Sequence, residues 1–130
     1  MNDEQGTTNQ GSSPLEVERT PLLRGIERFN AHEFWHAHEE WELLWLETGG
    51  EEKLFLQGLI QLAAAYHHVQ RGTHRGALRL FDASLRKLTR YPAGFFGVDR
   101  TEAVERAELH RTRVAKEKID ASEFPKIRYN

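Results

Sequence analysis

The chain has 130 residues, no cysteine and a formal net charge of -2, with a pI near 6.4. The absence of a basic field argues against a general role on nucleic acids or membrane surfaces, and the absence of cysteine excludes disulfides, thiolate metal sites and cysteine nucleophiles. No apolar run reaches the roughly 18 residues of a membrane span, so we expect a cytoplasmic protein without a nucleic-acid or membrane partner.

The first 19 residues, MNDEQGTTNQGSSPLEVER, are polar and contain no aromatic side chain. Such a segment cannot bury enough apolar surface to order itself, so it predicts a disordered N-terminal tail. Residues 20–130 remain, and their length predicts a single domain.

A first helix is expected to begin at Thr20-Pro21, with threonine as the N-cap and proline in the first turn, and to run to about Asn30. A second helix is expected over residues 32–48, because the two glycines that follow suit the end of a helix.

The third helix is expected over residues 51–71, with Gly72 just past its end. It is apolar nearly all round, which is typical of a helix covered on several sides. A fourth helix is expected over residues 73–90, where Tyr91-Pro92 would end it.

A fifth, highly charged helix is expected from Asp99 to about Asp120, with Asp99 and Glu102 as a capping box. The loop 93–98 carries two phenylalanines and should fold back on the core. The C-terminal residues 122–130 should be irregular and lie on the surface. No strand alternation is evident, so we predict an all-α bundle of about five helices around an antiparallel hairpin of the second and third helices.

The stretch from His32 to Trp45, HEFWHAHEEWELLW, contains all three tryptophans and four glutamates. With His38 at 0° on a helical wheel, Glu42 falls at about 40° and Phe34, Trp35, Trp41 and Trp45 fall between about 300° and 60°. The pattern therefore predicts that His38 and Glu42 point inward among aromatic rings, while Glu33, His36 and Glu40 face water.

The short turn at residues 49–50 predicts that facing residues of the hairpin have numbers that sum to about 99–100. His38 should then meet Gln61, and Glu42 should meet Gln57. Amide groups can donate and accept hydrogen bonds, so the two glutamines would supply partners for the buried imidazole and carboxylate.

Two interpretations follow. In the structural one, His38, Gln61, Glu42 and Gln57 form a hydrogen-bonded ladder that fixes the register of a non-enzymatic helical module. In the functional one, they belong to a small-molecule or hydrolytic pocket in which His38 and Glu42 are the acid–base candidates. The residues expected at this pocket or ladder are His38, Glu39, Glu42, Trp45, Gln57 and Gln61.

No cofactor is predicted. A divalent cation on His38 and Glu42 stays open, but two donors fall short of a ligand set, and the run lacks the second histidine of an HExxH motif. Whether the protein is an enzyme is also left open by the sequence.

The remaining histidines have simpler interpretations. His67 and His68 close the third helix, where an imidazolium suits the helix dipole, and His74 and His110 are expected on the surface. If the chain is instead an interaction module, exposed aromatics such as Phe95 and Phe96 would bind another protein or a second copy, so a homo-oligomer is a further expectation.

The runs FNAHEFWHAHEEWELLW and FLQGLIQLAAAYHHVQRGTHRGALRLF resemble the small bacterial and archaeal family called domain of unknown function 309. The resemblance covers about residues 24–90, and the segments GVD and PKIR near the C-terminus show a weaker similarity. The resemblance implies that the fold is a compact helical bundle. It does not imply any particular activity. The matching positions are Phe34, His38, Glu39, Glu42, Trp45, Gln57, Gly58, Gln61, Gly72, Gly76 and Ala77.

Overall fold

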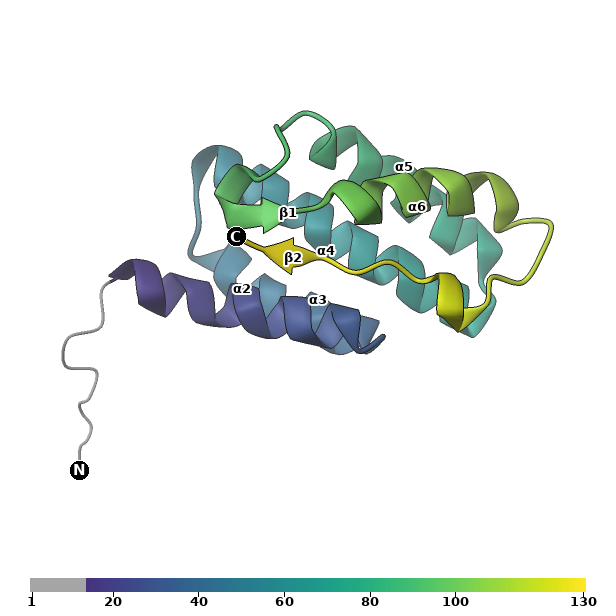
Figure 1. Ribbon diagram of the computed structural model, residues 1–130, viewed down its shortest axis with the longest axis horizontal. Helices are drawn as coiled ribbons and strands as arrows, with labels where there is room; N and C mark the ends of the chain where they lie inside the picture. The colour runs from purple at the N-terminus through teal and green to yellow at the C-terminus, as the bar shows by residue number, and fades with distance from the viewer. Residues whose placement is uncertain (1–13) are drawn as a thin grey trace, which may run out of the picture.

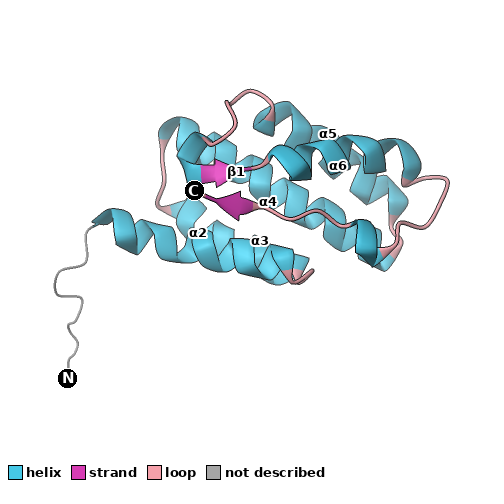
Figure 2. Ribbon diagram, viewed as in Figure 1, coloured by secondary structure: helices cyan, strands magenta, loops and turns pink. Residues whose placement is uncertain are grey.

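The computed structural model describes the backbone of residues 14–130 and the side chains from Thr20 onward. The helices of this range are α2 (Pro14–Asn30), α3 (Phe34–Leu46), α4 (Gly50–Arg71), α5 (His74–Leu88) and α6 (Thr101–Arg113), arranged as Figure 1 shows. The predicted all-α bundle is confirmed, and helices dominate the view in Figure 2. Of the tail predicted for residues 1–19, residues 1–13 lie outside the described residues, and residues 14–19 belong to α2 instead.

Helix α4 lies in the middle of the bundle, with α3 packed on one side and α5 on the other (Figure 1). Gly58 permits the close approach of α5, because a Cβ atom there would lie 2.9 Å from the Cδ2 atom of Leu88. The nearly uniform apolar character of α4 is explained by this central position. No helix in the described part of the chain is long and apolar enough to cross a membrane.

Helix α2 packs on α3 through Trp41, whose side chain is fully buried. Its indole Nε1–H donates to the carbonyl oxygen of Leu22 at 3.1 Å. Gly25 faces the same indole, and a Cβ atom at Gly25 would lie 2.1 Å from Nε1. The contact between the two helices therefore depends on a glycine in α2.

Several helix boundaries differ from those predicted. Helix α2 begins at Pro14, six residues before Thr20, so Pro21 lies inside it. Helix α3 begins only at Phe34, because His32 has a positive φ of 65° and cannot continue a helix. Helix α6 ends at Arg113 rather than near Asp120. The predicted end of α4 is confirmed, with Gly72 in the left-handed conformation.

The C-terminal segment is not a surface tail, contrary to the prediction. Phe124 and Ile127 are buried, and the ring of Phe124 packs 5.4 Å from that of Phe34 and 5.5 Å from that of Tyr66. The side chain of Asn30 pairs with both backbone polar groups of Ile127 at 2.8 Å. Long-range pairing of this kind leaves no local period in the sequence, which explains why it was missed.

The same segment forms a short sheet that the sequence did not predict. Strand β1 (Val98–Asp99) pairs antiparallel with β2 (Arg128–Tyr129), with Val98 opposite Tyr129. Short 3-10 helices precede the two strands, η1 at Phe95–Gly97 and η2 at Ala121–Glu123. The loop before β1 folds back as predicted, since Phe95 stacks on Tyr91 with ring centroids 4.6 Å apart.

Candidate functional site

The buried face of α3 is rotated away from His38. Its buried residues are Phe34, Ala37, Trp41 and Leu44, and on the wheel used above they centre about 80° from His38. The prediction that Glu42 points inward is therefore wrong, because the side chain of Glu42 is 51% exposed. The prediction weighed the aromatic residues and omitted Ala37 and Leu44, which face the core together with Trp41.

His38 lies at the edge of that buried face, and its side chain is only 15% exposed. The indole of Trp35 covers the imidazole, with ring centroids 4.4 Å apart and planes inclined by 10°. Trp35 is itself 46% exposed and also contacts the ring of His67 on α4, at 5.1 Å. An exposed tryptophan thus shields a half-buried histidine from water.

Three polar side-chain atoms of α3 and α4 are buried and have no hydrogen-bond partner among the described residues. They are Nδ1 of His38, Nε1 of Trp45 and Oε1 of Gln61. The Nδ1 atom of His38 lies 3.6 Å from a carboxylate oxygen of Glu42, a separation that gives an ion pair only when the imidazole is protonated. The predicted ladder is thus not formed at His38 Nδ1 or Gln61 Oε1.

The register of the α3–α4 hairpin agrees with the prediction. Trp35 contacts His67, and the ammonium group of Lys53 lies 4.1 Å from the ring centroid of Trp45. The residue numbers of these two pairs sum to 102 and 98. These sums lie on either side of the predicted 99–100, but Nδ1 of His38 and Oε1 of Gln61 do not pair with each other.

Exposed large apolar side chains are concentrated on α3 and α4. Of the six large apolar residues exposed within the described chain, Trp35, Leu43, Leu46 and Leu54 belong to α3 and α4, and Leu46 is 68% exposed. We call this surface the α3–α4 face. Its residues are Trp35, His38, Glu39, Glu42, Leu43, Trp45, Leu46, Lys53, Leu54, Gln57, Gln61 and His67.

A family model described as Domain of unknown function (DUF309) matches residues 22–80. These residues form a DUF309 domain. The matched segment runs from α2 into α5 and contains every residue of the α3–α4 face. The description of the family includes no activity. Among curated proteins, no sequence matches the chain.

The DUF309 domain does not assemble a metal ligand set in the described residues. No group of three or more His, Asp or Glu side chains converges there, so His38 and Glu42 have no third donor beside them. Two other glutamates of this region form ion pairs with arginines: Glu33 pairs with Arg28 at 2.8 Å, and Glu40 pairs with Arg24 at 3.1 Å.

The two histidines at the end of α4 differ from each other. Partial burial, together with the nearby charge of Arg71, lowers the pKa of His67, which opposes the imidazolium predicted there. His68 instead pairs its Nδ1 atom with the hydroxyl of Thr73, 2.6 Å away. His74 is exposed, as expected.

His110, which was expected on the surface, is fully buried beyond the DUF309 domain. Its Nδ1 atom lies 2.8 Å from the hydroxyl of Tyr66, and its Nε2 atom lies 3.7 Å from a carboxylate oxygen of Glu123. Arg113 holds that carboxylate with two hydrogen bonds of 2.6 and 3.1 Å. The signal was present in the sequence, because His110 continues the apolar stripe of Ala103, Ala107 and Val114 on α6.

Burial keeps the side chains of His110 and Tyr66 uncharged. It lowers the pKa of His110 and raises the pKa of Tyr66, while the guanidinium of Arg113 lowers the pKa of Glu123. The neutral imidazole and phenol therefore share a hydrogen bond in the core. Because His110 has no solvent exposure, we assign this cluster to stability rather than to a site.

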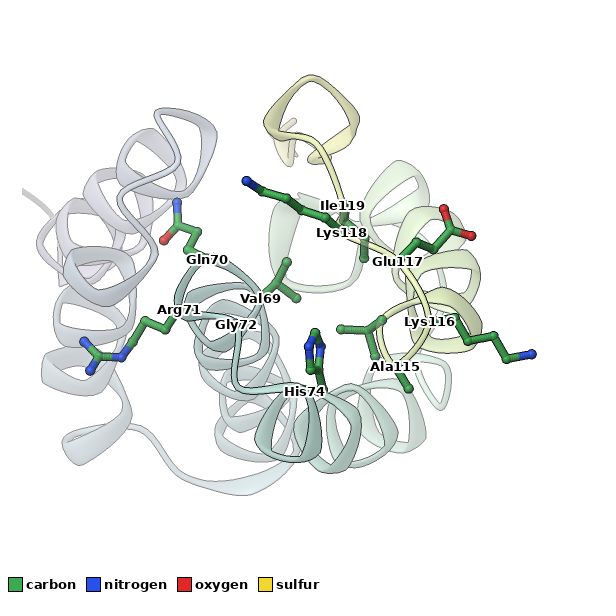
Figure 3. Close-up of a pocket in the computed structure, with 11 residues that line it drawn as sticks. Val69, Gln70, Arg71, Gly72, His74, Ala115, Lys116, Glu117, Lys118 and Ile119 are labelled. Carbon is green, nitrogen blue, oxygen red and sulfur yellow. The ribbon is translucent and has the colours of Figure 1, made fainter.

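A cleft of about 490 Å³ lies between the α4–α5 turn and the segment after α6. Figure 3 shows the imidazole of His74 pointing into this space, while Arg71 and Lys116 extend away from it. None of the six predicted site residues lines the cleft.

Proposed function

We propose that this chain is a polypeptide-binding module and that the α3–α4 face is its contact surface. The observation that carries the proposal is that four of the six exposed large apolar side chains in the described chain lie on two neighbouring helices, with Trp35, Leu43 and Leu46 on α3 and Leu54 on α4. Contiguous apolar patches on soluble proteins mark interaction sites, and tryptophan is common among residues that dominate binding.

The unpartnered polar atoms of the face support the same function. The Nδ1 atom of His38, the Nε1 atom of Trp45 and the Oε1 atom of Gln61 are buried without hydrogen bonds. A buried polar group without a partner costs about 1–3 kcal/mol. A bound polypeptide that turned these side chains outward and supplied the partners would recover part of that cost.

The charge of the face selects the kind of polypeptide. Its charged residues are Glu39, Glu42 and Lys53, a net charge of -1. The carboxylates of Glu39 and Glu42 are both more than half exposed beside the apolar residues. A partner with basic and apolar side chains would therefore be favoured over an acidic one.

A photo-crosslinking experiment tests the proposal. A benzophenone amino acid is placed at Leu46 in cells of the source organism, and a matched control carries it at Leu109, an exposed leucine on α6. We expect a discrete covalent adduct with a polypeptide from position 46 and none from position 109. Adduct patterns that do not differ between the two positions would reject the proposal.

A second candidate is a small-molecule or hydrolytic site at His38. The observation in its favour is that a half-buried imidazole with a free Nδ1 atom lies 3.6 Å from the Glu42 carboxylate. The carboxylate would orient the ring, and the imidazole would act as general base. Hydrolysis of a panel of chromogenic esters tests this candidate: His38→Gln should abolish turnover and the exposed control His74→Gln should not. Equal rates in the two variants would exclude it.

A divalent cation on His38 and Glu42 is a special case of that candidate. It would need solvent molecules or substrate to complete its coordination. Elemental analysis of protein purified without a histidine tag tests it. Substoichiometric metal, together with a melting temperature that EDTA does not change, would rule it out.

A further inference from the structure

The outer face of α5 carries a line of arginines. With His74 at 0° on a helical wheel, Arg75, Arg79 and Arg86 fall within an arc of about 40° and extend over about 16 Å, and Arg90 follows two residues after the end of the helix. All four side chains are exposed. We call these four residues the arginine stripe.

The arginine stripe is not neutralised within the described chain. Ion pairs form at Arg24, Arg28, Arg111 and Arg113, and no stripe residue has a carboxylate partner among the described residues. Asp82, the acid nearest the stripe in sequence, pairs with Arg111 of α6. Residues 71–90 contain six Lys or Arg and one Asp, a net charge of +5.

A second stripe on α3 offers the groups that guanidinium ions bind. On the α3 wheel, Trp35, Glu39, Glu42 and Leu46 fall within about 60° and extend over about 16 Å. Guanidinium groups form paired hydrogen bonds with carboxylates and stack on indole rings. Glu39 and Glu42 give this stripe two carboxylates that are more than half exposed, and the arginine stripe carries four exposed guanidinium groups.

The two stripes belong to helices on opposite sides of α4 (Figure 1). A two-fold axis parallel to α4 and outside the molecule would bring α3 of one copy over α5 of another and form both contacts at once. We propose that the chain forms a symmetric dimer in which the arginine stripe of each copy binds the Trp35–Leu46 stripe of its partner copy. The proposal rests on the proposed function, since it names the polypeptide that the α3–α4 face binds.

The same chain carries both a basic stripe and a stripe with carboxylates and an indole. This favours a second copy of the chain over a nucleic acid as the partner of the arginine stripe. A polyphosphate on the arginine stripe would satisfy α5 alone and would be repelled by the glutamates of residues 33–53. The neutral side chains of the α3 stripe, Trp35 and Leu46, would also remain exposed. Nucleic-acid binding is therefore treated as an outcome of the test.

Sedimentation of charge-reversed variants tests the dimer. The basic-face variant is Arg79→Glu/Arg86→Glu, and the acidic-face variant is Glu39→Arg/Glu42→Arg. A matched control, Arg106→Glu/Lys116→Glu, changes the charge equally at exposed positions on and after α6. Unchanged circular dichroism would show that each variant is folded.

We expect the wild type and the control to sediment at about twice the 15.1 kDa mass of one chain, and each single-face variant to sediment as a monomer. An equimolar mixture of the two variants should restore the dimer, because both interfaces then pair Glu with Arg. The wild-type dimer should dissociate between about 0.1 M and 1 M salt, where the Debye length falls from about 10 Å to 3 Å.

Three results would overturn the dimer. These are a monomeric wild type, variants that associate like the wild type, and binding of a DNA oligonucleotide that only the basic-face variant loses. If the wild type is monomeric while position 46 still crosslinks to a different polypeptide, the proposed function stands and this inference fails. If position 46 forms no specific adduct and the wild type is monomeric, both fail.

Discussion

Gly25 marks the closest contact between α2 and α3. The indole of Trp41 occupies the space that a side chain at Gly25 would need, since a Cβ atom would lie 2.1 Å from Nε1 and 2.3 Å from Cδ1. The indole is fully buried and bonded to the carbonyl of Leu22, so it cannot turn away. A single methyl group is therefore enough to force the two helices apart.

We predict that Gly25→Ala lowers the free energy of unfolding by about 1–3 kcal/mol, the usual cost of overpacking a core. Urea denaturation measures this change. Gly49→Ala is the matched control, because a Cβ atom at Gly49 meets nothing within 4 Å and should change stability by about 0.5 kcal/mol or less. Equal losses in the two variants would contradict the packing of α2 on α3.

The buried pair of Tyr66 and His110 makes stability depend on pH. Burial lowers the pKa of His110 below its ordinary value, so the unfolded chain binds a proton at a higher pH than the folded chain. The stabilisation is present above the unfolded pKa of about 6.5 and is lost as pH falls below it.

We predict that wild-type stability falls between about pH 7.5 and pH 5.5, by no more than about 1.4 kcal/mol per pH unit for this group. His110→Gln should flatten that dependence, and the exposed control His74→Gln should retain it. Urea denaturation at each pH gives the comparison. Measurements above pH 5 also avoid the range in which Glu123, whose pKa Arg113 lowers, becomes protonated. Parallel curves for the two variants would argue against a neutral, buried His110.

At the scale of the element, the orientation of α3 decides which side chains are free to bind. Neighbouring leucines have opposite environments, since Leu43 is 57% exposed and Leu44 is 5% exposed. The helical wheel drawn from the sequence centred the core on His38, which lies about 80° from the centre of the face that is buried. Stability measurements on this pair distinguish the two orientations.

We predict that Leu44→Ala costs about 2–5 kcal/mol, as expected for a core leucine, and that Leu43→Ala changes stability by about 0.5 kcal/mol or less. Thermal and urea unfolding of both variants measure the difference. Similar costs at the two positions would show that α3 lies in another orientation.

The sequence predicted features that a local period or a short turn determines. Gly72, the all-round apolar α4 and the register of the α3–α4 hairpin were found in this way. The exposure of Glu42 and the burial of His110 were not predicted, because a second neighbouring helix decides which part of an amphipathic helix is covered. The apolar spacing of α6 carried the signal for His110.

At the scale of the whole molecule, the C-terminal segment joins helices that lie far apart in the sequence. Phe124 packs against Phe34 of α3 and Tyr66 of α4, while the backbone N–H of Lys126 donates to the Glu102 carboxylate of α6 at 3.0 Å. These contacts link the DUF309 domain to the rest of the chain, so we expect the described residues to unfold as one unit.

We predict that Phe124→Ala costs about 3–5 kcal/mol, the range for a buried phenylalanine. Because every tryptophan of the chain lies in α3, tryptophan fluorescence reports on that helix and circular dichroism on all of them. In Phe124→Ala, the urea midpoints measured by fluorescence and by circular dichroism should fall by the same amount. In the control Leu109→Ala, both midpoints should stay unchanged. A fluorescence midpoint unaffected by Phe124→Ala would show that α3 unfolds independently of the C-terminal segment.

The central claim is that another polypeptide covers the α3–α4 face. Hydroxyl-radical footprinting of the full chain in cells, compared with dilute purified protein, measures this directly, because it detects a covered surface whatever the partner is. We predict that Trp35, Leu43 and Leu46 become protected in cells, while Leu23 and Leu109, exposed on α2 and α6, are modified equally in both samples. Equal modification of Trp35, Leu43 and Leu46 in the two samples would contradict the claim.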